Sequence, residues 1–455
     1  MSGRIKARIF NGTRDLMPEE MIPRQKMLRV MTTVFERFGF APLETPVMEF
    51  MEVLQGKYGA EGDKLIYPLA YKGGKTLGLR FDLTVPLSRL VAMRPELTLP
   101  FKRYQIQPVY RGDRPQPAQG RFREFYQCDV DTVGTASLIA DAENIAVCYE
   151  IYRELGLLDA GLIMRINNRK VLRALVEAAG LDAGMDNAVC TALDKIDKIG
   201  REKVEELLGE AGVDAEARRK LFDLIDLGEE IGPTEHRALI EALTPKLAGT
   251  STGAEGLLEL QELFAHLDAL GVPAELLYFD LVLTRGLDYY TGPIYEFRIT
   301  ALENFGSLGG GGRYDDLLSL YGAKETPATG VSIGLSRVQS ALEKLGRLKP
   351  ELTATKVMVL RLEDLALSDQ LGLVSTLRKS GLPTEIYYDL ARFKKQIAYA
   401  DKRGIPYVLI QGPKELERGV VQLKDIRIGV QNEMPLSEVV AFISAQDEAG
   451  ELGTS

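Results

Sequence analysis

The sequence predicts an α+β domain with a mainly antiparallel sheet, interrupted by a helical insertion and followed by a smaller α/β domain. The chain has 455 residues, more than one ordinary core accommodates. Apolar and polar residues alternate over much of residues 77–131, which is typical of antiparallel strands with one buried face. Beyond residue 355, strand-like and helix-like segments follow one another, as in a compact α/β unit.

The composition is typical of a globular chain, with 45% hydrophobic and 27% charged residues. No apolar run reaches the roughly 18 residues of a membrane helix, and no apolar segment follows the basic N-terminus. We therefore expect neither a membrane span nor a secretory signal. The spacing of Cys128, Cys148 and Cys190 fits no zinc or disulfide framework, which favours a cytoplasmic location.

The net charge of -9 argues against broad contact with nucleic-acid phosphates. The charge is unevenly distributed, because residues 354–443 carry a slight positive excess and residues 190–250 an acidic one. The C-terminal segment therefore permits RNA binding without demonstrating it.

An amphipathic helix is predicted near the N-terminus. Its apolar residues recur at the spacing of one helical face: Met27, Val30, Met31, Val34, Phe35 and Phe38. Gly39 ends this helix, and Pro42 and Pro46 favour an extended segment after it.

Strand patterns follow at residues 77–82 and 104–111, and another resumes after a turn-like loop at residues 114–120. This hairpin has a polar face that carries Arg111, Arg121, Arg123, Phe125, Gln127, Asp129 and Asp131. Three guanidinium groups on one face favour an anionic ligand such as a polyphosphate, and an aromatic ring there can stack on a base. The alternative is a solvated face with Arg–Asp ion pairs.

The rest of the first domain is predicted as a helical, acidic insertion at about 168–265, followed by strands at 276–283, 294–299 and 329–334. Residues 346–355 are predicted to be a linker and 447–455 a tail, so the domains span 1–345 and 356–446. In the second domain we predict strands at 357–360, 384–388, 407–411 and 420–423, and helices at 368–379, 392–403 and 436–445.

Two glycine-rich segments could carry chemistry. Residues 284–292 place Arg285 directly before Gly286, and Tyr289 and Tyr290 between Gly286 and Gly292. This arrangement suits a small polar ligand, although a turn with a tyrosine anchor also explains it. The run Gly309–Gly312 is neither a dinucleotide fingerprint nor a P-loop, and we expect a flexible loop. With only two histidines, His236 and His266, a histidine-based triad or zinc site is not expected.

These segments resemble the histidyl-tRNA synthetases, a family of class II aminoacyl-tRNA synthetases. Residues 38–46 are similar to motif 1, residues 110–113 and 120–129 to motif 2, and residues 330–337 to motif 3. Residues 285–292 resemble the peptide that distinguishes the histidine enzymes within the class. The stretches 400–406 and 417–424 are similar to the anticodon-binding domain. The resemblance therefore implies a class II catalytic domain at 1–345 and an anticodon-binding domain at 356–446.

The resemblance also implies site residues. Arg111 and Arg285 would act in catalysis on opposite sides of the α-phosphate. The residues implied for ATP are Arg111, Asp113, Arg121, Phe125 and Arg337. Those implied for histidine are Asp82, Thr84, Arg111, Gln127, Asp131, Arg285, Tyr289 and Tyr290. No protein-held metal site is implied, although Mg²⁺ would accompany ATP.

The implied activity is ATP-dependent ligation of histidine to tRNA(His) through a histidyl-adenylate, in a homodimer formed through motif 1. The alternative is the related regulatory subunit of ATP phosphoribosyltransferase, which binds histidine without charging tRNA. The chain departs from the family pattern at Asn11, Asp113, Asp316 and Ser336. None of these departures removes an implied catalytic group.

Overall fold

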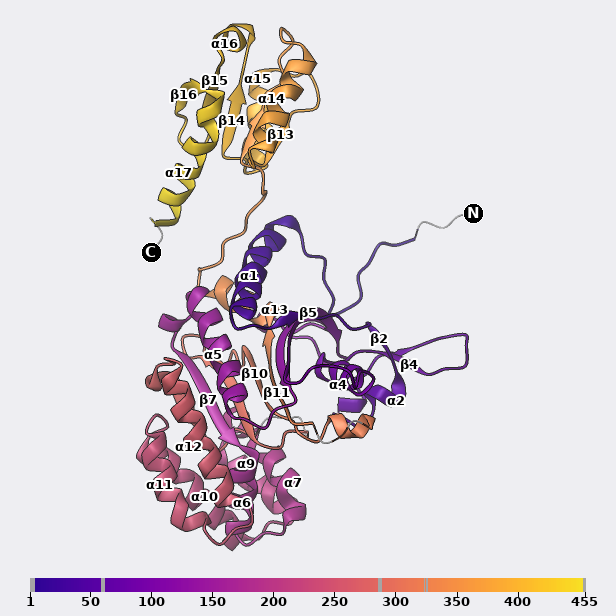
Figure 1. Cartoon of the computed structure of the whole chain (residues 1–455), viewed down its shortest axis with the longest axis vertical. Coiled ribbons are helices and arrows are strands. Elements are labelled where there is room, and N and C mark those ends of the chain that lie inside the picture. The colour runs from indigo at the N-terminus through magenta and orange to yellow at the C-terminus, as the bar shows by residue number, and fades with distance from the viewer. Residues whose placement is uncertain (1–4, 59–61, 285–288, 323, 325, 453–455) are drawn as a thin grey trace. The chain divides into compact units, whose positions relative to one another are not determined.

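The computed structural model describes residues 5–58, 62–284, 289–322, 324 and 326–452. The chain divides into two compact units, whose elements are labelled in Figure 1. The first unit contains Met27–Leu348 and the N-terminal segment to Arg14, and the second contains the chain from Lys349 together with Asp15–Lys26. Within the described ranges, no helix combines the length and the apolar character that crossing a membrane requires.

A large sheet organises the first unit. Across the described chain its strands lie in the spatial order β1 (Ala41–Pro42), β5 (Phe101–Tyr110), β6 (Glu124–Val133), β11 (Ala328–Gly334), β10 (Gly309–Arg313), β9 (Pro293–Ile299), β7 (Leu162–Asn168) and β8 (Leu277–Phe279). The end pairs β1–β5 and β7–β8 are parallel, and the pairings between them are antiparallel. The predicted mainly antiparallel sheet is therefore confirmed.

A smaller sheet joins β2 (Met48–Phe50), β4 (Leu77–Leu79) and β3 (Pro68–Leu69) in that spatial order, β4 being the centre. The N-terminal helix prediction is also confirmed, since α1 spans Pro18–Arg37. On its predicted apolar face, Met31, Val34 and Phe35 are fully buried because they pack into the core of the first unit.

Two further helices matter for the cavity described below. Helix α4 (Thr84–Ala92) begins beside Asp82, and α13 (Leu335–Lys344) begins directly after β11. Helix α5 (Ile139–Glu154) contributes buried side chains to the main core of the first unit.

The glycine run forms a strand, so the prediction of a flexible loop for Gly309–Gly312 is wrong. Strand β10 pairs with β11 on one side and with β9 on the other. A Cβ on Gly311 would lie 1.9 Å from the carbonyl oxygen of Gly330, and one on Gly312 would lie 2.6 Å from that of Pro293. Gly311 and Gly312 are therefore required by close packing between strands rather than by flexibility.

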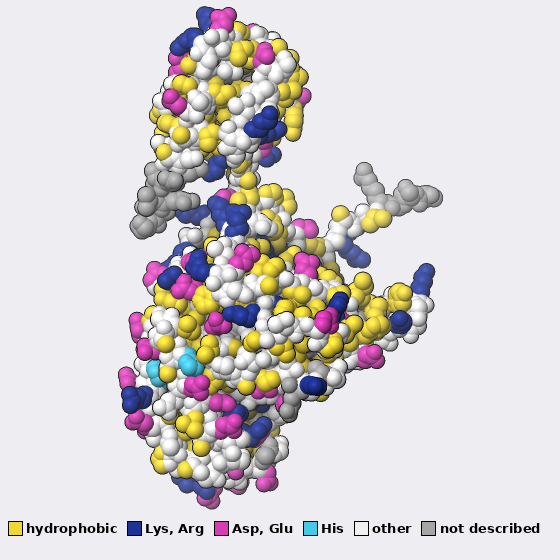
Figure 2. All heavy atoms as spheres, in the orientation of Figure 1, with side chains coloured by type: hydrophobic (Ala, Val, Ile, Leu, Met, Phe, Trp, Pro, Cys, Tyr) yellow, Lys and Arg dark blue, Asp and Glu magenta, His cyan; other side chains and the backbone are white. Residues whose placement is uncertain are grey.

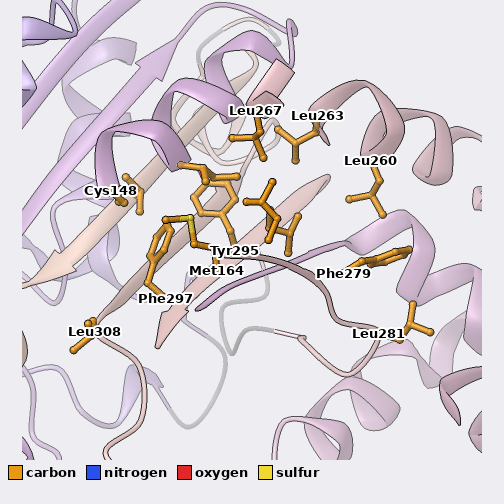
Figure 3. Close-up of a cluster of buried hydrophobic side chains, with 14 of the residues drawn as sticks. Cys148, Met164, Leu260, Leu263, Leu267, Phe279, Leu281, Tyr295, Phe297 and Leu308 are labelled. Carbon is orange, nitrogen blue, oxygen red and sulfur yellow. The ribbon is translucent and has the colours of Figure 1, made fainter. Parts of the chain in front are cut away.

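The predicted helical insertion is confirmed and shares its core with the sheet. Its helices are α6 (Arg169–Ala178), α7 (Asp186–Leu193), α8 (Ile196–Ile199), α9 (Arg201–Glu210), α10 (Ala215–Ile231), α11 (His236–Leu247) and α12 (Gly253–Ala269). Figure 3 shows Leu263 and Leu267 of α12 near Met164 of the sheet, in the same buried cluster. The insertion is thus packed into the core of the first unit and does not form a core of its own.

The second unit is a five-stranded α/β layer, with strand order β13 (Thr384–Ile386), β12 (Val357–Val359), β14 (Tyr407–Ile410), β15 (Val420–Asp425) and β16 (Gln431–Pro435). From Lys349 on, its helices among the described residues are α14 (Leu367–Lys379), α15 (Phe393–Lys402), α16 (Pro413–Arg418) and α17 (Val439–Leu452). The sequence patterns missed α16 and β16, which are short and largely polar. Figure 2 shows charges of both signs interspersed over the face in view.

Candidate active site

One cavity of about 630 Å³ opens over the middle strands of the large sheet. Its volume lies in the range of small-molecule sites. The predicted site residues that line it are Asp82, Thr84, Arg111, Asp113, Arg121, Phe125, Gln127, Asp131, Tyr289, Tyr290 and Arg337. Arg285, the remaining predicted residue, lies outside the described residues. Residues separated by about 255 positions along the chain are thus brought to one cavity by the sheet.

Strand β6 positions the polar side chains of the cavity. Phe125, Gln127, Asp129 and Asp131 occupy alternate positions, so they project from the same face of the strand. On this face Gln127, Asp129 and Asp131 are buried, and Phe125 is half-buried. The amide of Gln127 donates to the hydroxyl of Ser332 on β11 at 2.6 Å, which orients it across the floor of the cavity.

Asp82 and Asp131 form an acidic end of the cavity. Oδ1 of Asp82 accepts hydrogen bonds from the hydroxyl of Tyr58 at 3.1 Å and from the backbone N–H of Val85 at 3.0 Å. Asp131 forms an ion pair with Arg103 at 2.7 Å, and the hydroxyl of Tyr314 donates to it. Burial raises the pKa of both carboxyl groups, while these partners favour the ionised forms.

Two tyrosines close this end of the cavity. The ring centroids of Tyr289 and Tyr290 are 4.9 Å apart. Burial raises the pKa of Tyr289 well above its ordinary value, and Thr84 is its side-chain hydrogen-bond partner. Tyr289 therefore stays a neutral phenol, which can donate as well as accept a hydrogen bond.

Arg111 is held half-buried next to the acidic end. Its guanidinium carbon lies 4.3 Å from the ring centroid of Phe81 and 5.2 Å from that of Phe125. Its Nε donates to the carbonyl oxygen of Phe81 at 3.1 Å. These contacts hold the side chain in place before a ligand binds, which reduces the cost of ordering it.

Arg121 and Arg337 give the cavity a basic end. Arg337 donates to the carbonyl oxygen of Gln119 at 3.1 Å and also to backbone oxygens of the 305–307 segment. Burial, and then the positive charge of Arg121, lower the pKa of Arg337 to about 10. Arg121 and Arg337 repel each other at the wall of the cavity, so together they form a site for an anion.

Arg123, the third arginine of the predicted polar face, is absent from the described cavity lining. Its guanidinium donates to the carbonyl oxygens of Asp113 at 3.1 Å and Asn11 at 3.0 Å. The prediction that all three arginines of this hairpin converge on one ligand is therefore wrong for Arg123. This side chain instead fixes the N-terminal segment against the loop at 112–116.

Sequence patterns missed three residues of the acidic end: Tyr58, Arg103 and Tyr314. Period-two alternation places Arg103 on the polar face of β5, but only the strand register places it opposite Asp131. Tyr314 directly follows β10, which was not predicted as a strand. Within the described ranges, no group of three acidic, histidine or cysteine side chains is arranged to hold a metal ion.

The sequence model of the family described as histidyl-tRNA synthetase matches residues 12–338. That of the anticodon binding domain matches residues 356–446. The histidine–tRNA ligase of Cytophaga hutchinsonii is 39% identical over 461 residues, covering 96% of this chain and 99% of the relative. The histidine–tRNA ligase of Rhodopirellula baltica is 41% identical over 424 residues, covering 93% of this chain and 94% of the relative.

The fold agrees with these sequence matches. The crystal structure of histidyl-tRNA synthetase from Nostoc sp. PCC 7120 is similar with a TM-score of 0.86 and 32% identity, over 97% of this chain and 100% of that one. Both the catalytic segment and the anticodon-binding segment therefore have matches in the same proteins. The chain belongs to the histidyl-tRNA synthetase family.

Proposed function

We propose that the protein ligates histidine to tRNA(His) in two steps, through a histidyl-adenylate. The observation that carries this proposal is one cavity with carboxylates at one end and guanidinium groups at the other. Asp131 and Phe125 are six residues apart on one strand, which corresponds to about 20 Å at the usual rise of ~3.3 Å per residue. An amino acid and ATP placed end to end need an elongated site of this kind.

Histidine would occupy the acidic end. Asp82, Thr84 and Gln127 would bind its α-amino group, because carboxylate, hydroxyl and amide oxygens accept from an ammonium. Asp131 and Tyr290 would recognise the imidazole ring, with Tyr289 beside them. Burial of these groups supports selectivity, since a ligand without ring nitrogens would leave them without hydrogen bonds.

ATP would occupy the basic end. Arg121 and Arg337 would bind the outer phosphates, Phe125 would stack on the adenine, and Asp113 would lie near the nucleotide. The half-buried Arg337 supports this assignment, because its guanidinium is already fixed by backbone oxygens and needs little reorganisation. Arg111, next to the acidic end, would contact both the histidine carboxylate and the α-phosphate.

In the first step, the histidine carboxylate oxygen attacks the α-phosphorus of ATP and pyrophosphate leaves. Arg111 and Arg285 would stabilise the negative charge that develops on the α-phosphate oxygens. In the second step, a ribose hydroxyl at the 3′ end of the tRNA attacks the adenylate carbonyl and AMP leaves. Catalysis would rest chiefly on positioning and electrostatics.

Mg²⁺ would accompany the nucleotide. Magnesium in such sites binds through substrate phosphates, waters and one or two carboxylates, so a dedicated protein cage is not needed. The exposed carboxylate of Asp113 at the cavity fits one ligand position of such an ion. Bound there, Mg²⁺ would neutralise phosphate charge.

The proposed domains are a catalytic domain at 1–345 with its insertion at about 168–265, a linker at 346–355, an anticodon-binding domain at 356–446 and a tail at 447–455. The anticodon-binding domain would bind tRNA. A hollow on α15 and the neighbouring β15 end supports a docking site there, since it is lined by Lys394, Ile397, Ala398, Asp401 and Ile426.

We also propose a homodimer formed through the motif 1 segment, α1 and β1, and a cytoplasmic location. The three cysteines are buried thiols, which supports a reducing compartment. The regulatory-subunit alternative is disfavoured, because full-length relatives named histidine–tRNA ligase match across both domains.

The test is pyrophosphate exchange with each amino acid in turn, followed by aminoacylation of tRNA(His). Histidine alone should support exchange, and the product should be histidyl-tRNA. Histidine binding without exchange would support the regulatory-subunit alternative and contradict the proposal.

A further inference from the structure

Arg103 is a fully buried arginine beneath the cavity. It lies on β5 directly opposite Asp131 of β6 in the antiparallel register, so the two side chains share one face of the sheet. Its Nη2 is 2.7 Å from a carboxylate oxygen of Asp131. With an exposed fraction of 0%, Arg103 does not reach the ligand space itself.

The same nitrogen atom reaches the other half of the acidic end. Nη2 of Arg103 also donates to the carbonyl oxygen of Leu83 at 3.3 Å. Leu83 stands between Asp82 and Thr84, two of the three residues proposed for the α-amino group. Arg103 therefore connects the segment that would bind the α-amino group to the strand that would bind the imidazole.

The positive charge of Arg103 affects the ionisation of the buried carboxylates around it. Asp82, Asp129 and Asp131 are all buried around the acidic end. Burial raises the pKa of Asp131, and Arg103 is the main opposing influence, followed by Tyr314. Without the guanidinium, a buried carboxylate facing other carboxylates would be driven toward its neutral form.

We propose that Arg103 is a positioning residue for histidine: it holds the carboxylate of Asp131 in place against the Asp82–Thr84 segment. This inference rests on the proposed function, because it assigns Asp131 to the imidazole. The effect of Arg103 is exerted through Asp131 and Leu83, and it should therefore affect histidine and leave ATP largely unaffected.

The experiment uses the full-length protein and measures pyrophosphate exchange with histidine and ATP varied separately. Arg103→Met should raise the histidine KM by roughly tenfold to a hundredfold, because it removes the cation of the ion pair and leaves the buried carboxylate of Asp131 uncompensated. The ATP KM should change by less than about twofold, because Arg121 and Arg337 are untouched. Arg103→Lys keeps the charge and should recover part of the loss.

A double-mutant cycle with Asp131→Asn tests whether the two residues act together. If Arg103 acts through Asp131, adding Arg103→Met to the Asp131→Asn variant should raise the histidine KM little further. Additive effects of the two substitutions would overturn the inference.

The matched control is Arg165→Met. Arg165 is also buried and ion-paired, with Asp197 at 2.8 Å, but it lies on β7 and does not contact Asp131. It should lower the melting temperature without raising the ratio of the histidine KM to the ATP KM.

Equal changes of both KM values in Arg103→Met, or the same KM ratio in Arg103→Met and Arg165→Met, would show that Arg103 is only structural. If Arg103→Met does not fold, an Arg103→Lys protein with unchanged histidine KM and reduced stability would lead to the same conclusion. Failure of the proposed function is distinguishable, because the unmodified protein would then show no histidine-dependent exchange.

Discussion

The carboxylate of Asp131 occupies the space that a side chain at Gly330 would fill. A Cβ built on Gly330 would lie 2.0 Å from Oδ1 of Asp131 and 2.5 Å from its Cγ. The two residues lie opposite each other in the β6–β11 register. Gly330 therefore determines where the acidic group of the cavity can lie.

Gly330→Ala is expected to displace the Asp131 carboxylate and to impair the use of histidine. A misplacement of about 1 Å at a reacting site can cost up to about 100-fold in rate. Steady-state pyrophosphate exchange should show a fall in kcat/KM for histidine. The control is Gly228→Ala on α10, where the nearest atom would lie at an ordinary 3.6 Å. Normal histidine kinetics in Gly330→Ala would contradict this account.

Asp129 is expected to make stability depend on pH. Burial raises its pKa to about 7, whereas an aspartate in the unfolded chain has a pKa of about 3.9. Between these values the folded protein holds a proton that the unfolded chain has lost. Its contribution to stability is therefore present at low pH and is lost as the pH rises toward 7.

Asp129→Asn should accordingly melt at a higher temperature than the unmodified protein above about pH 7, with a difference that narrows toward pH 4. Each unit of pKa separation corresponds to about 1.4 kcal/mol. Thermal unfolding without substrates, across this pH range, measures the effect. A difference in melting temperature that does not vary with pH would rule out titration of Asp129 as its cause.

Arg121→Ala is expected to weaken the binding of ATP and to leave the binding of histidine unchanged. Arg121 is exposed, so its removal leaves the packing intact, and Arg337 loses a repelling neighbour. The ATP KM should rise by about tenfold, the lower end of the range for a hydrogen bond to a charged group. Arg94→Ala, another exposed arginine, is the control. A larger change in the histidine KM would place Arg121 outside the ATP site.

The double variant Lys394→Ala, Lys395→Ala is expected to weaken tRNA binding alone. Both lysines are exposed on α15, near one of the hollows of the second unit. Loss of two phosphate contacts should raise the tRNA KM and reduce the salt slope of binding by about 2. Lys379→Ala on α14 is the control. If pyrophosphate exchange falls as well, the effect is not confined to tRNA.

The sequence was most informative where side-chain alternation is long. Strands β5 and β6 are ten residues each, and the period-two pattern of β6 placed Phe125, Gln127, Asp129 and Asp131 on one face, where all four line the cavity. Strand β10 was missed because Gly309–Gly312 has no side chains to alternate, and its place is set by neighbours on both sides. Arg103 was missed for a related reason: its partner depends on the register between strands, which local composition does not encode.

The parallel pairing of β7 with β8 limits how the catalytic domain can be shortened. Because β7 and β8 run in the same direction, the last residue of β7 and the first residue of β8 lie at opposite ends of the strand pair. A tight turn therefore cannot join them. Helices α6 to α12 provide that crossing. A minimal enzyme designed from this scaffold must therefore keep at least one helix as a bridge, and α12, which seals the sheet with Leu260, Leu263 and Leu267, is the one to retain.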